Sequence, residues 1–159
     1  MQITILAVGS IKEKFYREAI KEFEKRLSRY CRLKIIEVDD EKTPDPGSEK
    51  MCEMVLKREG DKLSCHIPDN AYVISLAIEG RKYDSVEFSK KLNNLAITGK
   101  SNIVFIIGGS LGICEDIKKR SDELLSFSDM TFPHQLMRVI LLEQVYRAYR
   151  IIQNEPYHK

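Results

Sequence analysis

The chain has 159 residues, 43% of them apolar, which suffices for one α/β domain with a hydrophobic core, so we expect a single domain over residues 1–159. No apolar stretch approaches membrane-spanning length and no basic leader with a cleavage site opens the sequence, so we expect a cytoplasmic protein without a membrane partner. The net charge of +2 is too small to indicate a nucleic-acid partner by itself, and the four scattered cysteines give little support to a zinc site or disulfides.

The first part of the chain predicts a strand, a helix and a second strand. Residues 3–8 form an apolar run that ends at Gly9, which is typical of a buried strand. Apolar residues then recur at intervals of three and four across residues 16–30, which predicts an amphipathic helix packed on a sheet. Residues 33–38 predict the second strand, and a loop rich in acidic residues and proline follows.

Charge is distributed unevenly over this region. Residues 12–34 carry nine Lys or Arg against four Glu, whereas residues 37–53 carry seven acidic residues against two Lys. A basic face could contact RNA phosphates, but a solvated helix surface explains the same charges. Composition alone does not decide between these two interpretations.

The middle of the chain predicts a helix, a strand and another helix. Ser48 is a candidate cap for a helix that continues to about Ser64, although Gly60 is unfavourable inside it. Residues 71–78 predict a third buried strand that breaks at the following Glu-Gly pair. Ser85 is expected to cap the next helix, which ends near residue 99.

The last part begins with the clearest buried strand, residues 103–107, followed by a glycine cluster and a short helix through about Leu124. An apolar segment over residues 124–128 then leads to Pro133, which suits the first turn of a helix. This last helix is apolar on more than one face, so we expect the sheet to cover one side and a partner subunit the other. The alternation of strands and helices predicts an α/β fold with a mostly parallel sheet and helices on both faces.

Two segments are candidates for a ligand site. The glycine-rich loop 108–112 follows a buried strand, where α/β proteins bind ligands, but its spacing fits neither the dinucleotide-binding nor the phosphate-binding pattern. Residues 126–135, SFSDMTFPHQ, form a polar loop bounded by aromatic residues that could line a pocket. Alternatively, Thr131 helps to cap the last helix and both phenylalanines belong to the core. His134 could act as a base, although a histidine in a first helical turn is more often structural or exposed.

The last six residues, NEPYHK, combine an aromatic ring, an imidazole and a cation. Such side chains suit a splayed RNA base and its phosphate. Terminal residues are, on the other hand, usually disordered.

Taken together, ITILAVGSIKEKF, FIIGGSLG, LSFSDMTFPHQLMRVILLEQVYRAYRI and the terminal PYHK resemble the RlmH family of bacterial ribosomal RNA methyltransferases. The resemblance implies a SPOUT fold with a C-terminal trefoil knot that binds S-adenosylmethionine. It further implies a homodimer that methylates N3 of a pseudouridine in helix 69 of 23S ribosomal RNA, on the assembled ribosome. No metal is required for such a transfer.

The resemblance also implies a set of site residues. The cofactor pocket would comprise Leu76, Gly108, Phe127, Ser128, Asp129, Met130, Thr131 and Phe132. Tyr157 and His158 match the family's C-terminal pair, expected near the target base, with His158 as the candidate general base and Tyr157 orienting or stacking. Arg138 could anchor a phosphate or pair with a carboxylate. Two alternatives remain open, a SPOUT methyltransferase that acts on tRNA and a non-catalytic nucleotide- or RNA-binding module.

Overall fold

Five parallel strands form one sheet in the computed structural model, which describes all residues from 1 to 159. The strands are β1 (Gln2–Val8), β2 (Arg32–Val38), β3 (Tyr72–Lys82), β4 (Asn102–Ile107) and β5 (Glu123–Ser126). Their order across the sheet is β2-β1-β4-β3-β5, and all four pairings are parallel. The predicted parallel sheet is therefore confirmed, with β1 and β4 at its centre.

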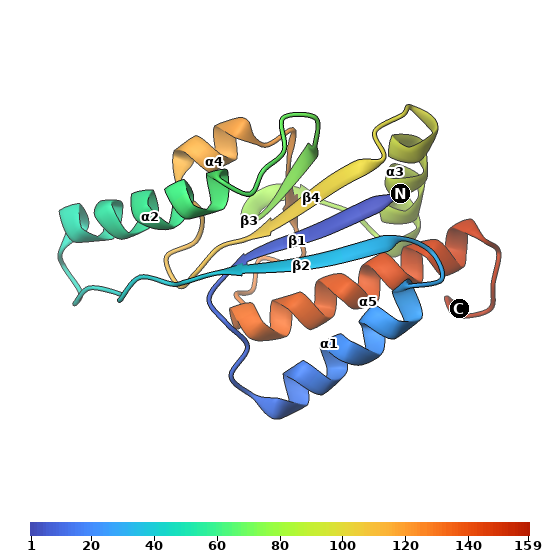
Figure 1. Cartoon of the computed structure of the whole chain (residues 1–159), viewed down its shortest axis with the longest axis horizontal. Helices are drawn as coiled ribbons and strands as arrows, with labels where there is room; N and C mark the ends of the chain where they lie inside the picture. The colour runs from blue at the N-terminus through green and yellow to red at the C-terminus, as the bar shows by residue number, and fades with distance from the viewer.

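Helices cover both faces of this sheet (Figure 1). They are α1 (Lys14–Leu27), α2 (Glu49–Ser64), α3 (Ser85–Ile97), α4 (Glu115–Arg120) and α5 (His134–Ile152). Buried side chains of α1, α3 and α5 form one apolar cluster with the sheet, and those of α2 and α4 form a second. Helix α5 packs between α1 and α3, so it is the central helix of its face.

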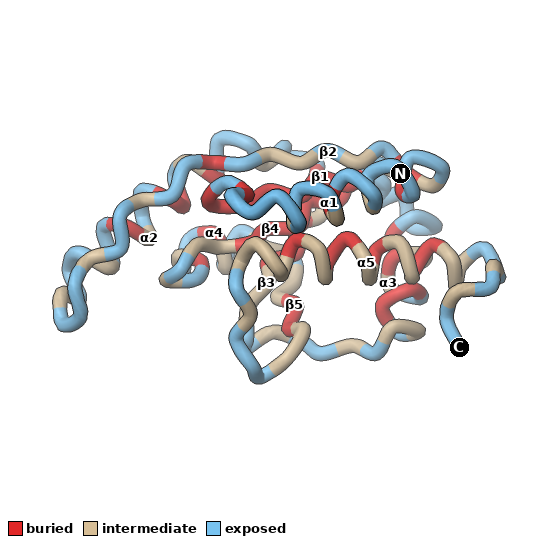
Figure 2. Tube along the Cα trace, turned by 90° about the horizontal axis from the view of Figure 1, so that it is seen from below, coloured by how far each residue is buried: buried red, intermediate tan, exposed pale blue.

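The alternation of side chains along β1 divides the core between the two faces. Ile3 and Ile5 belong to the cluster with α1, α3 and α5, whereas Leu6 and Val8 belong to the cluster with α2 and α4. Because both faces are covered, β1 and β4 are buried almost throughout, as the continuous apolar runs predicted (Figure 2).

Several element boundaries differ from those predicted. Strand β3 does not break after residue 78 but continues to Lys82, with a register shift against β5 between Leu76 and Arg81. Gly80 sits in this irregular stretch, where a Cβ would lie 2.6 Å from the backbone of Leu124. The strand therefore continues because glycine permits a close approach of two backbones.

The helix ends also differ in detail. Asp84, not Ser85, is the N-cap of α3, where its side chain accepts from the backbone N–H of Glu87 in a capping box. Ser48 occupies the N-cap position of α2 without a side-chain cap bond. Helix α4 ends at Arg120, and Glu123–Ser126 form β5.

Gly60 lies inside α2 because Cys114 packs against it. A Cβ at this position would collide with the Cys114 sulfur. The glycine therefore brings the chain after β4 close to α2, at a cost of about 1 kcal/mol in helix propensity.

Candidate active site

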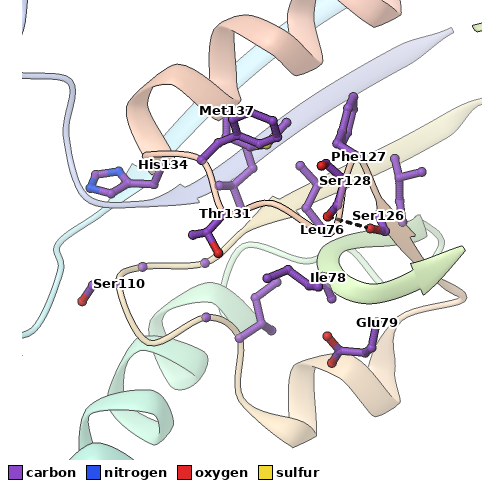
Figure 3. A pocket seen from close by; sticks show the side chains of 18 of the residues that line it. Leu76, Ile78, Glu79, Ser110, Ser126, Phe127, Ser128, Thr131, His134 and Met137 are labelled. Carbon is purple, nitrogen blue, oxygen red and sulfur yellow. Dashed lines mark hydrogen bonds between the residues drawn. The ribbon is translucent and has the colours of Figure 1, made fainter. Parts of the chain in front are cut away.

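A pocket of about 750 Å³ lies at the carboxyl ends of β3, β4 and β5, beside the start of α5 (Figure 3). Its walls come from residues 76–79 in the second half of β3, from the glycine-rich loop after β4 and from the loop between β5 and α5. The apolar side chains include Leu76, Ile78, Ile107, Ile113, Phe127, Met130 and Met137. The volume and the apolar lining are those of a small-molecule site.

The shape of the glycine-rich loop depends on Gly108. A Cβ there would overlap the backbone of Gly112 and lie 2.8 Å from the side chain of Ile113. Gly112 has a positive φ of 85° and its N–H donates to the carbonyl of Gly109 at 3.0 Å. The loop thus folds back tightly on itself, which leaves backbone exposed to the pocket.

Gly109 has a different environment. Although it lines the pocket, its Cβ would point at the protein, 3.0 Å from Oε2 of Glu59 and 3.1 Å from Val8. The space beside Gly109 is therefore filled by α2 and β1, and a side chain there would push against the buried carboxyl of Glu59.

The structure brings most of the predicted cofactor residues together. Seven of them line the pocket: Leu76, Gly108, Phe127, Ser128, Met130, Thr131 and Phe132. Asp129 does not, since its side chain is 81% exposed and pairs with Lys82 at 2.6 Å. Thr131 does not cap α5, whose N-cap is Pro133, so the alternative role considered for Thr131 is wrong.

Hydrogen bonds within the loop after β5 hold its turn. Met130 N–H donates to Oγ of Ser128 at 3.0 Å, and Ser126 Oγ donates to the Ser128 carbonyl at 3.3 Å. Phe127 also packs on the apolar cluster of α5, so it serves the core and the pocket wall together.

Three charged or titratable side chains interrupt the apolar lining. Glu79 pairs with Lys118 at 2.6 Å on one wall. On the opposite side, Nδ1 of His134 is buried without a hydrogen-bond partner. Burial, followed by the charge of Arg138, lowers the pKa of His134, so its imidazole is neutral near pH 7.

Arg138 does not reach the pocket, and the expectation that it contacts a phosphate is corrected. Its side chain is 1% exposed and pairs with Glu37 of β2. The guanidinium also donates to the carbonyls of Val8, at 3.0 Å, and Gly9. Arg138 therefore ties α5 to the ends of β1 and β2, which corresponds to the alternative of pairing with a carboxylate.

The C-terminal tail is folded against the far end of α5. Its chain reverses at Asn154, with a φ of 53°, and the Glu155 carboxylate then forms an ion pair with Arg150 at 2.8 Å and accepts from Arg29 at 3.0 Å. Beyond it, Tyr157 lies edge-on to Tyr146, with ring centroids 5.0 Å apart. The tail is thus held by specific contacts.

Two further side chains of α5 contact the predicted catalytic pair. The Tyr157 hydroxyl donates to Glu143 at 3.1 Å, and Arg147 lies over the Tyr157 ring, 4.7 Å from its centroid. Nδ1 of His158 lies 3.4 Å from the Arg147 guanidinium, within hydrogen-bond reach.

The tail and the pocket lie at different ends of α5. Met137 lines the pocket, whereas Arg147 contacts the tail. At 1.5 Å per residue, about 15 Å of helix axis separates the two positions. Within one chain, therefore, Tyr157 and His158 are not part of the pocket.

Comparisons with known proteins bear on this arrangement. The family model described as "Predicted SPOUT methyltransferase" matches residues 1–158. The chain belongs to the SPOUT methyltransferase family. Relatives named "Ribosomal RNA large subunit methyltransferase H" are similar to it over the full length of both chains, at 57% identity in Clostridium kluyveri and 56% in Bifidobacterium adolescentis. The resemblance to the RlmH family is thereby confirmed.

Solved structures agree with the SPOUT fold. A probable methylase family protein from Haemophilus influenzae has a TM-score of 0.59 and 14% identity, with 99% of this chain and 70% of that chain covered. The putative methyltransferase Lpg2936 from Legionella pneumophila, solved with the bound cofactor SAM, has a TM-score of 0.51 and 12% identity, with 94% and 66% covered. At these identities the likeness concerns the fold alone.

Sequence reasoning missed several residues that the SPOUT fold places at the two sites. Glu143 and Arg147 have the spacing of an ordinary surface ion pair on a helix, and only the folded tail shows that they hold Tyr157. Lys118 and Met137 enter the pocket from α4 and α5. No group of His, Cys, Asp and Glu is arranged to hold a metal ion, and no helix is long and apolar enough to cross a membrane.

Proposed function

We propose that this protein is an S-adenosylmethionine-dependent methyltransferase that methylates N3 of a pseudouridine in helix 69 of 23S ribosomal RNA, on the assembled ribosome. The observation that carries the proposal is the pocket at the ends of three strands, lined by seven of the eight residues expected to bind the cofactor. The names of the full-length relatives support the ribosomal RNA substrate. Such a substrate would place the protein in the cytoplasm.

The pocket fits a nucleoside cofactor in size and chemistry. Its apolar walls would enclose the adenine, and the exposed backbone of the glycine-rich loop would supply hydrogen bonds. S-adenosylmethionine would supply a methyl group on a sulfonium there, while these residues orient it and exclude water. The trefoil knot of the SPOUT fold stays a prediction.

The tail would act on the target base in a site completed by a second subunit. The tail contacts α5 at Glu143 and Arg147, about 9–15 Å along the helix axis from Met137 of its own pocket, so a homodimer that brings the two ends together would form a composite site. Leu136, Ile140 and Glu143, spaced along α5, are only partly buried and could form part of the subunit interface.

The two tail residues would have different roles. Burial, followed by the Glu143 carboxylate, raises the pKa of Tyr157, so its hydroxyl keeps its proton and can orient or stack on the base. His158 is exposed beside Arg147 and would accept the N3 proton as the base attacks the methyl group. The imidazole would thus hold the proton that N3 releases when the methyl group is transferred from the sulfonium, whose sulfur–methyl bond breaks in the same step.

The test is to incubate ribosomes lacking the modification with labelled cofactor and the protein, and then to map the labelled nucleotide. Label at N3 of the helix 69 pseudouridine is expected. Label in tRNA instead would favour the alternative SPOUT substrate. Failure to bind S-adenosylmethionine at millimolar concentration would favour a non-catalytic RNA-binding module.

A further inference from the structure

The exposed surface of α1 carries a stripe of cations. Lys14, Arg17, Lys21 and Lys25 recur at intervals of three and four residues, and Arg29 follows in the turn after the helix. This spacing places the four helical side chains on one face. All of them are exposed, and Figure 2 shows most of α1 in the colour of exposed residues.

Most of this charge is not neutralised within the chain. Lys21 and Lys25 have no carboxylate within ion-pair distance, because Glu22 pairs with Arg26 at 2.8 Å. Lys14 is 3.7 Å from Glu18, but both side chains are mostly exposed, and such a pair contributes little. The stripe therefore keeps its charge available for an outside partner.

The stripe connects the two ends of the candidate site. Near the start of α1, Lys12 N–H donates to the side chain of Gln135, at the end of α5 that borders the pocket. After α1, Arg29 pairs with Glu155 in the tail at 3.0 Å. Helix α1 thus runs along α5 from the pocket end to the tail end (Figure 1).

We propose that Lys14, Arg17, Lys21 and Lys25 bind consecutive phosphates of the ribosomal RNA strand that carries the target base. This inference rests on the proposed function, which places the tail at that base. Neighbouring cations of the stripe are about 4.5–6 Å apart along the helix axis, and the stripe points toward the tail. The acidic residues between β2 and α2 lie elsewhere, so the molecule presents its basic side with the tail.

The chemistry of the stripe favours RNA over a protein partner. Among the exposed residues of α1 from Lys14 to Lys25, Phe15 at the start of the helix is the one apolar residue, and the others are charged. A protein interface needs an apolar centre, whereas phosphate binding needs only positioned cations.

The experiment compares two matched double variants of the full-length protein. Lys21→Gln with Lys25→Gln removes the middle of the stripe. Lys50→Gln with Lys57→Gln removes two exposed lysines of α2 and is the control. Binding to ribosomes is measured by sedimentation over a range of KCl concentrations without cofactor, and calorimetry with S-adenosylmethionine checks that the pocket is intact.

The stripe variant should bind ribosomes roughly tenfold or more weakly than wild type at moderate salt. Its logarithmic salt dependence should be shallower by about 1.4–1.8, because two phosphate contacts are lost. The control variant should match wild type in its affinity for ribosomes and in the salt dependence of that affinity. Both variants should bind S-adenosylmethionine as tightly as wild type. Protein-free 23S RNA should show the same difference between wild type and stripe variant.

Equal binding and equal salt dependence of the stripe variant and wild type would overturn the inference, as would an equal loss in the control. A loss seen with ribosomes but absent with protein-free RNA would assign the stripe to a ribosomal protein and also overturn it. If the expected differences appear but wild type transfers no methyl group to the ribosome, the stripe stands and the proposed function fails.

Discussion

The hydroxyl of Tyr157 donates to Oε1 of Glu143 at 3.1 Å, which anchors the end of the chain to the helix that begins beside the pocket. The same carboxylate pairs with Arg147, which in turn lies against the Tyr157 ring and His158. Anchor and pocket are therefore parts of one rigid helix, and their separation is fixed. A tail held in this way suits a site on a neighbouring subunit.

Truncation after Pro156 should remove methyl transfer while leaving cofactor binding near the wild-type level. The deleted residues contact α5 only at the surface, and the proposed base is lost with them. Loss of a general base lowers the rate by about 100-fold or more. Single-turnover methylation of ribosomes and calorimetry with S-adenosylmethionine measure the two effects, and deletion of Lys159 alone is the control.

A mixed dimer tests whether the tail acts on the other subunit. One subunit carries the truncation and the other carries Gly108→Ala, so that one composite site keeps both an intact pocket and an intact tail. Such dimers should recover up to about half of wild-type activity, by counting sites under two-fold symmetry. If they remain inactive while each variant supports activity when paired with wild type, the tail serves its own subunit.

Gly108→Ala should abolish or strongly weaken cofactor binding. Its methyl group would meet the backbone of Gly112, so the loop must open and the pocket wall must move. Gly99→Ala is the matched control. At Gly99 the backbone φ of 79° makes alanine unfavourable, but no atom lies within 4 Å of the added Cβ. We expect the control to lose about 1–2 kcal/mol of stability while its cofactor affinity stays unchanged. Equal affinities in the two variants would contradict the assignment of the pocket.

Arg138→Met should destabilise the protein by about 2–4 kcal/mol without changing the salt dependence of ribosome binding. The substitution leaves the carbonyls of Val8 and Gly9 without their donor and separates α5 from β2. Arg138→Lys should restore only part of the stability, because one ammonium cannot reproduce the guanidinium geometry. Urea unfolding at fixed protein concentration measures the loss. If Arg138→Met has wild-type stability but binds RNA more weakly, Arg138 contacts RNA after all.

Glu59→Gln should stabilise the protein increasingly as the pH rises. Burial, together with the charges of Asp40 and Glu41, raises the pKa of Glu59, although a bond from the Glu41 backbone N–H opposes this. The folded state therefore retains a proton that the unfolded state releases, so wild type loses stability as pH rises through the raised folded pKa. The variant cannot ionise and avoids this loss.

The measurement is the Tm of both proteins between about pH 5 and pH 8. Glu53→Gln, an exposed carboxylate on the same helix, is the control and should follow wild type. A Tm difference for Glu59→Gln that does not grow with pH would show that the buried carboxyl ionises without cost.

By itself, the sequence determined the elements and their kind. Continuous apolar runs such as residues 103–107 can be satisfied only by burial on both faces, and the three- and four-residue spacing in α1 and α5 defines their packed sides. The sequence also indicated that the glycine-rich loop and the SFSDMTFPHQ segment lie at strand ends. In a parallel sheet those ends share one edge, so most of the pocket was predictable from local patterns.

Only the tertiary structure decided which polar residues meet. Arg138 and Glu37 are far apart in sequence, and their pairing depends on where α5 crosses the ends of β1 and β2. The roles of Glu143 and Arg147 depend in the same way on the turn at Asn154, which sends the tail back along α5. Apolar periodicity is a local property, because the position of a residue on its own helix or strand determines whether its side chain is buried or exposed. Hydrogen bonds and ion pairs are short-ranged and directional, so their partners are set by distances that exist only after the elements have packed.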